Sequence, residues 1–348
     1  MLYEACVEWL GTLSLVFGGC CSHAISLEQV TGQYPHAGSL ITLCHFAAIS
    51  AQGLPQHLHW TSTGPRFKPR RIPIGPYLVQ VVLFYFISLL NNAAFAYRIP
   101  MSVHIIFRSG GLVVSMILGW LVSGKRYSIT QVLSILVVTI GVLLTTLSAS
   151  SPKSKATDAD FSSYSYGIGI LSLALLFSGF LGIAQDWTYS KYSQPTPSKD
   201  DQIQKSEEKP TEPWQESMFY LHFLALPMFF TVRSGLAEQW AQVQESPRIQ
   251  AGPIIIPSAY ISLAINTFTQ VICVAGVNRL TTRVSALTVT LVLVVRKALS
   301  LVLSVLGFGS GKSDVNMSMM WAGAALVLLG TIGYASGTGK AKKKDKKE

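Results

Sequence analysis

Apolar stretches separated by short polar loops run along the whole of this chain. Each stretch is about 20 residues long, which at 1.5 Å per residue is enough to cross a hydrocarbon core of roughly 30 Å as a helix. The pattern therefore predicts an all-α polytopic membrane protein with ten transmembrane helices. The expected spans are residues 6–27, 37–54, 74–97, 101–122, 129–149, 166–187, 217–236, 254–276, 284–306 and 318–337. In the seventh span, Pro227 predicts a kink, because proline removes a backbone donor.

The composition agrees with this pattern, since 49% of the 348 residues are apolar and only 13% are charged. The net charge of +10 does not indicate a nucleic-acid partner, because most basic residues lie in short loops and in the terminal run. All five cysteines lie in apolar segments, so we interpret them as small hydrophobic residues and not as a disulfide framework. They are Cys6, Cys20, Cys21, Cys44 and Cys273.

Lysines and arginines predict the orientation of the chain. With both termini in the cytosol, the cytosolic parts hold roughly three times as many basic residues as the opposite side, as the positive-inside rule requires. The polar, proline-containing loop 190–216 is expected to be a disordered cytosolic linker, and residues 338–348 a basic cytosolic tail.

The Ser-rich run 148–165 leaves five expected helices on each side. A half with an odd number of spans forces the next half to enter from the opposite face. The sequence therefore predicts two inverted five-helix repeats, residues 1–150 and 151–337, as in many transporters.

Basic residues inside the spans are the strongest functional signal. Arg296 and Lys297 lie near the middle of span 284–306, where a charge costs about 2.5–3.5 kcal/mol even on a mild insertion scale. Helical spacing places Thr290 on the same side as Lys297. Span 101–122 adds His104 and Arg108, which share a face with two small residues, Gly111 and Ser115.

The acidic residues near spans are Glu4, Glu8, Glu28 and Asp186, and all lie toward predicted ends. The three central cations therefore predict a positive cavity for an anionic ligand. The alternative is that Arg108 bonds to carbonyl groups while the small residues only let helices pack closely.

Amides supply further candidate ligand contacts. Asn266 and Gln270 are four residues apart in one span, and Asn91 and Asn92 end another. They could bind a base or sugar hydroxyls, and they could equally join helices by hydrogen bonds. Tyr220 could stack on a ligand, although a tyrosine near a helix end is more often a packing or interfacial residue.

The chain ends in GKAKKKDKKE, in which Lys344 and Lys346 have the spacing of a dilysine retrieval signal. Such a signal is read by coat proteins and needs a cytosolic C-terminus. The simpler interpretation is a basic flank that contacts the lipid surface.

Five stretches of the sequence resemble the nucleotide-sugar transporters of the endoplasmic reticulum and Golgi, with the greatest similarity to the branch that carries UDP-N-acetylglucosamine and UDP-xylose. They are GGCCSHAISLE (18–28), NNAAFAYRIPMSVHIIFRSGGL (91–112), KRYSI (125–129), FYLHFLALP (219–227) and LTTRVSALTVTLVLVVRKALSLVLSVL (280–306). The resemblance covers nearly all of the chain outside the linker and tail. The stretches HFLALP and VVRK depart from some relatives, which leaves the sugar specificity open.

The resemblance implies a drug/metabolite-transporter fold that exchanges a cytosolic UDP-sugar, foremost UDP-N-acetylglucosamine, for lumenal UMP by alternating access. It implies phosphate contacts from Arg296 and Lys297, a second basic contribution from Arg108, and a pocket lined by Tyr220, Asn266 and Gln270. No enzyme activity, cofactor or metal is expected, and a homodimer is left open.

The alternatives are a carrier of the same fold for UDP-xylose or another organic phosphate and, more remotely, a polytopic membrane transferase. The acidic pairs that a transferase would use, Asp158 with Asp160 and Asp200 with Asp201, lie in polar loops.

Overall fold

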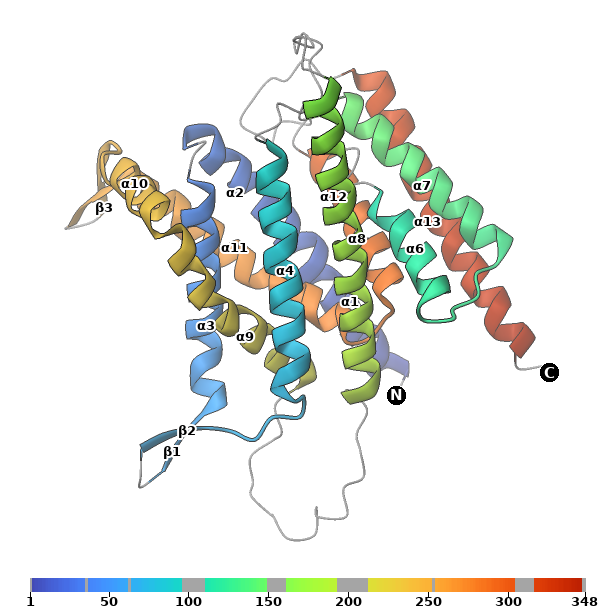
Figure 1. Ribbon diagram of the computed structural model, residues 1–348, viewed down its shortest axis with the longest axis horizontal. Helices are drawn as coiled ribbons and strands as arrows, with labels where there is room; N and C mark the ends of the chain where they lie inside the picture. Colours follow the sequence, from blue (N-terminus) through green and yellow to red (C-terminus); the bar gives the residue numbers. More distant parts are fainter. Residues whose placement is uncertain are drawn as a thin grey trace. The chain divides into compact units, whose positions relative to one another are not determined.

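The structure is a computed structural model (Figure 1) that describes residues 2–34, 37–61, 64–95, 110–148, 161–192, 212–251, 254–303 and 316–345. Three predicted functional residues, His104, Arg108 and Lys346, lie outside the described residues, as do the side chains of Asn92 and Lys344.

The described chain is mostly helical, as predicted. Its helical elements are α1 (Leu2–Ser14), the π-helix η1 (Leu15–Gly19), α2 (Cys20–Gln33), α3 (Gly38–His57), α4 (Ile74–Phe95), α6 (Gly111–Leu121), α7 (Ile129–Ser148), α8 (Phe161–Tyr192), α9 (Pro213–Ala225), the 3₁₀-helix η2 (Leu226–Val232), α10 (Arg233–Gln244), α11 (Ser258–Thr281), α12 (Ala286–Leu303) and α13 (Met317–Asp345).

Seven helical stretches of the described chain are long and apolar enough to cross a membrane. They correspond to the first, third, fifth to eighth and tenth predicted spans, so the prediction of a polytopic membrane protein is confirmed at that level. Helices α8 and α13 extend beyond the predicted spans. The linker predicted at 190–216 therefore has helical ends, and the tail predicted at 338–348 begins inside α13.

The predicted break in the seventh span is also confirmed. Helix α9 ends at Ala225, and the stretch that contains Pro227 forms the 3₁₀-helix η2 before α10 begins. Proline removes an α-helical hydrogen bond here, and a tighter turn replaces it.

Two compact units make up the chain: unit 1 contains Met1–Val81 and Ala184–Val284, and unit 2 contains Val82–Ile183 and Ser285–Glu348. Their boundaries fall inside α4 and α8. This division follows contacts and not internal symmetry, so the predicted inverted repeats stay a prediction.

Unit 1 carries two short hairpins that the sequence analysis did not predict. Strand β1 (Leu58–Thr61) pairs antiparallel with β2 (Gly64–Phe67), and β3 (Arg248–Ala251) pairs in the same way with β4 (Ile254–Pro257). The first hairpin follows α3 and the second follows α10. Figure 1 shows the two hairpins at opposite ends of α3.

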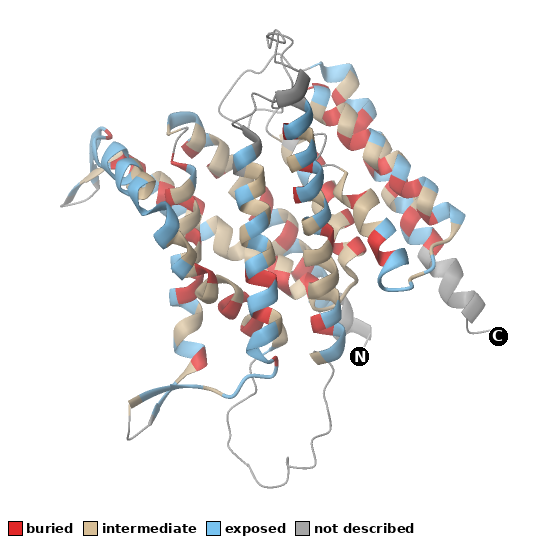
Figure 2. Cartoon of the chain, viewed as in Figure 1, coloured by how far each residue is buried: buried red, intermediate tan, exposed pale blue. Residues whose placement is uncertain are grey.

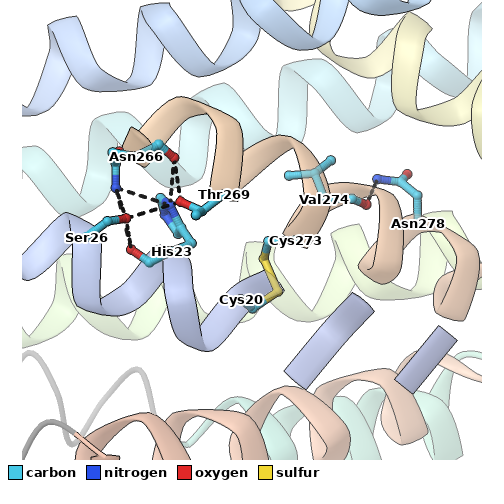
Figure 3. The surroundings of a disulfide bond; sticks show 8 residues. All are labelled: Cys20, His23, Ser26, Asn266, Thr269, Cys273, Val274 and Asn278. Carbon is cyan, nitrogen blue, oxygen red and sulfur yellow. Dashed lines mark hydrogen bonds between the residues drawn. A yellow bond between two sulfur atoms is a disulfide. The ribbon is translucent and has the colours of Figure 1, made fainter. Parts of the chain in front are cut away.

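A disulfide between Cys20 and Cys273 joins α2 to α11 in unit 1, with the two Cα atoms 4.4 Å apart (Figure 3). The interpretation of these two cysteines as simple hydrophobic residues is therefore wrong. The helices approach so closely because Gly19 faces α11, where an added Cβ would lie 2.7 Å from the side chain of Ile272. Residues 253 positions apart give no sign of this contact in the sequence.

Close packing in unit 2 is strongest between α7 and α13. A Cβ on Gly141 would lie 2.7 Å from the carbonyl oxygen of Gly323, so the two backbones nearly touch. Figure 2 shows buried residues where these helices meet and exposed residues on their outer faces. Leu133, Ile140 and Leu329 are among the exposed residues, as expected of helices that contact lipid.

One buried acid that the sequence analysis did not consider, Glu216, stabilises an end of unit 1. Its carboxylate accepts hydrogen bonds from the backbone amides of Arg71 and Ile72, both at 3.0 Å, and from the hydroxyl of Tyr77 at 3.3 Å. The side chain is only 3% exposed. It thus ties the first turn of α9 to the segment that leads into α4.

Replacing Glu216 by Ala removes the acceptor for the backbone amides of Arg71 and Ile72, of which the second is buried. We expect the free energy of unfolding to fall by about 1.5–3 kcal/mol, because hydrogen bonds to a charged group are lost inside the protein. Chemical and thermal denaturation of the detergent-purified protein measure this. The control is Glu238→Ala, an exposed position on α10, where the change should stay within about 0.5 kcal/mol. Equal stability of the two variants would contradict this role of Glu216.

Candidate functional site

A cavity of about 310 Å³ lies in unit 2 between α4, α6, α8 and α12. This volume is at the lower end of the range for ligand pockets, roughly 300–1,000 Å³. We call it the unit 2 cavity. Its lining residues are Ile87, Asn91, Gly111, Leu112, Ser115, Leu171, Ala174, Leu175, Ser178, Gly182, Thr290, Leu293, Val294, Arg296 and Lys297.

Helix α12 supplies the charged part of the lining. Thr290 and Lys297 are two helical turns apart, so they share the cavity face, and Arg296 borders it. The Lys297 side chain is exposed to the cavity although it lies in an apolar helix, and Arg296 is half-buried. The other sixteen residues of α12 bear no charge.

Small and polar residues on the other helices complete the lining. Gly111 and Ser115 come from α6, and Ser178 and Gly182 come from α8, each pair four residues apart and hence on one helix face. Asn91 donates its Nδ2 group to the carbonyl of Ile87 at 2.8 Å. The described lining contains two cations and no carboxylate, so it carries net positive charge.

The contribution of α8 to the cavity was not predicted from the sequence. The signal was present as SGFLG, residues 178–182, in which a serine and a glycine four positions apart interrupt an apolar helix face. Such a pair also serves helix packing, so the sequence alone does not assign it to a cavity.

Asn266 has a different environment, in unit 1. It is fully buried, its Nδ2 donates to Ser26 Oγ at 3.0 Å, and its Oδ1 accepts from His45 Nε2 at 2.7 Å. Figure 3 shows Ser26, His23 and Thr269 around it, where α2 meets α11. These contacts favour the helix-joining interpretation of this amide. Gln270, one turn further on, is half-buried.

Tyr220 also lies in unit 1, within a cluster of aromatic rings. It is 3% exposed, and its ring stacks on Tyr77 with the centroids 5.5 Å apart. The guanidinium of Arg70 lies 5.5 Å from the same ring centroid. Neighbouring Phe219 stacks on His57 at 4.5 Å. In this structure the packing interpretation therefore describes Tyr220.

The structure thus brings four of the predicted ligand contacts together in the unit 2 cavity, and three others belong to unit 1. Those in the unit 2 cavity are Asn91, Thr290, Arg296 and Lys297. Those in unit 1 are Asn266, Gln270 and Tyr220.

Comparison with known proteins agrees on one family. Residues 8–338 match the UAA transporter family. The chain is 34% identical to the UDP-N-acetylglucosamine transporter YEA4 of Saccharomyces cerevisiae, with 97% of each chain covered. It is also 34% identical to the UDP-xylose and UDP-N-acetylglucosamine transporter of Danio rerio, with 93% of each covered. A further relative, the endoplasmic reticulum GDP-fucose transporter of Drosophila melanogaster, is 34% identical over 94% of this chain and 90% of its own.

A solved crystal structure superimposes with a TM-score of 0.56 at 13% sequence identity, covering 92% of this chain and 95% of the other. This similarity shows a shared fold.

Replacing Asn266 by Ala tests its structural role. We expect a loss of about 1–3 kcal/mol in the free energy of unfolding, because His45 and Ser26 lose a buried partner. Ligand affinity, measured by isothermal titration calorimetry, should stay unchanged. Gln270→Ala, on the same helix but half-buried, is the control and should cost less stability. Full stability combined with lost binding in Asn266→Ala would instead make this amide a ligand contact.

Proposed function

The chain belongs to the UAA transporter family, and from this premise we propose that it carries a UDP-sugar, foremost UDP-N-acetylglucosamine, into the lumen of the Golgi or endoplasmic reticulum in exchange for UMP. Its family and relatives are nucleotide-sugar transporters and not enzymes, which sets aside the membrane transferase.

The unit 2 cavity is the observation that supports this proposal. Arg296 and Lys297 give its lining positive charge, and Thr290 adds a hydroxyl. A UDP-sugar carries about two negative charges and UMP about −1.5 to −2, because a phosphomonoester is nearly fully ionised at neutral pH. The same pair of cations therefore suits both ligands. Arginine offers a planar fork of donors for phosphate oxygens, and lysine offers a point charge.

Coupled exchange follows from the cost of buried charge. An empty carrier would change faces with the cations of α12 in a medium of low dielectric constant, which is unfavourable. Either anion lowers that barrier, so transport in one direction depends on an anion returning in the other. Arg108, three residues before Gly111 in the sequence, is proposed as a second basic contributor.

The finer architecture is part of the proposal: ten spans in two inverted five-helix repeats, with both termini in the cytosol. The two hairpins of unit 1 support it. In each predicted half a hairpin joins the second expected span to the third, and the hairpins lie at opposite ends of α3 (Figure 1). An inverted repeat places corresponding parts on opposite faces. With a cytosolic C-terminus, Lys344 and Lys346 are proposed as a retrieval signal for coat proteins.

A carrier for UDP-xylose or for another organic phosphate is the second candidate, since one relative is named for both UDP-sugars. A thermal-shift screen with a panel of nucleotide sugars separates these candidates, because a ligand that binds the folded state raises its apparent stability.

Replacing Lys297 or Arg296 by Ala tests the site. Uptake of UDP-N-acetylglucosamine into proteoliposomes preloaded with UMP should fall about 10- to 100-fold or more in each variant, the effect of losing a charged hydrogen bond. Arg248→Ala, an exposed position on β3, is the control and should transport normally. Size-exclusion profiles and melting temperatures establish that each variant is folded. Full transport by both cavity variants would refute this assignment.

A further inference from the structure

Two glycines in the unit 2 cavity differ from the glycines on the same helices that close packing requires, Gly119 on α6 and Gly179 on α8. Gly182 on α8 and Gly111 on α6 both line the cavity. A Cβ built on Gly182 would lie 3.5 Å from the Cβ of Ala286, and one built on Gly111 would lie 4.0 Å from Leu175 Cδ1. Both distances are ordinary van der Waals contacts, so a methyl group fits at either position without moving a neighbour among the described residues.

The glycines that serve packing have no such room. A Cβ on Gly179, also on α8, would lie 2.5 Å from Leu118 Cδ1 and 3.0 Å from Val114 Cγ1. That glycine is required for the approach of α6 to α8. Since Gly182 lies nearly one turn away and has space for a methyl group, close packing does not account for it.

Glycine in a helix is less stable than alanine, because it loses more backbone freedom on folding. At Gly111 and Gly182, neither close packing nor helix stability favours glycine over alanine. Here the vacant volume belongs to the cavity that Arg296 and Lys297 line, so an alanine would take volume from the cavity itself.

We propose that Gly111 and Gly182 determine the size of the sugar that this carrier accepts. This inference rests on the proposed function. The UDP part is common to UDP-N-acetylglucosamine and UDP-xylose, whereas N-acetylglucosamine has a 2-acetamido group and a hydroxymethyl group that xylose lacks. The missing side chains at the two positions leave the space that these groups occupy. The adjacent hydroxyls of Ser115 and Ser178 provide hydrogen-bonding partners for the acetamido group and sugar hydroxyls.

Gly182→Ala and Gly111→Ala test the proposal in proteoliposomes preloaded with UMP. For each variant, the exchange of three ligands is compared: UMP, UDP-xylose and UDP-N-acetylglucosamine. UMP has no sugar. UDP-xylose is also measured as a competitor of UDP-N-acetylglucosamine. We expect the efficiency for UDP-N-acetylglucosamine to fall about tenfold or more, the usual effect of one methylene group in a tight pocket. UDP-xylose should lose less, and UMP, which has no sugar, should lose least.

Gly169→Ala is the matched control. It lies on α8, is exposed, does not line the cavity, and has no atom within 4 Å of its Cβ position. It should leave all three exchange reactions unchanged. The melting temperatures of all variants should equal or exceed that of the wild type, because alanine is the better helix former.

Two results would overturn this inference and leave the proposed function standing, provided that the wild type exchanges all three ligands. The first is an equal loss for all three ligands in the two glycine variants, and the second is no loss for any of them. A wild-type protein that exchanges none of the three would refute the proposed function, and the inference with it.

Discussion

The cost of positive charge among apolar helices is the constraint on which the rest of this structure depends. Helix α12 is 18 residues long and apolar along most of its length, yet it carries Arg296 and Lys297. In the proposed ten-span arrangement α12 crosses the membrane, and a charge in the middle of a span costs about 2.5–3.5 kcal/mol unless it reaches a polar environment. The unit 2 cavity provides that environment, and the small residues of α6 and α8 provide its space.

Polar groups serve different purposes in the two units. In unit 1, Glu216 and Asn266 are buried and hydrogen-bonded to neighbouring segments, and the Cys20–Cys273 disulfide adds a covalent link between α2 and α11. Such groups hold helices together, since a buried polar group without a partner is destabilising. In unit 2, three polar residues of α12 line a cavity: Thr290, Arg296 and Lys297. In the proposed function, an anion of opposite charge that binds there offsets the cost of the two cations.

Those parts of the fold and of the candidate site that depend on local, periodic signals could be predicted from the sequence. Hydrophobic length gives the spans, Pro227 gives the break between α9 and α10, and helical spacing places Thr290 and Lys297 on one face. What the sequence could not decide depends on contacts between distant residues. The disulfide, the hydrogen bonds of Glu216 to Arg71 and Ile72, and the role of Asn266 are set by which helices become neighbours. An amide in a span has the same appearance in the sequence whether it binds a ligand or a histidine of another helix.

A structure of the protein saturated with UMP tests the central claim most directly. The account predicts that the phosphate lies in the unit 2 cavity, with its oxygens about 2.7–3.2 Å from the side-chain nitrogens of Arg296 and Lys297. A ligand bound in unit 1 beside Asn266 or Tyr220, with the unit 2 cavity free of phosphate, would contradict it.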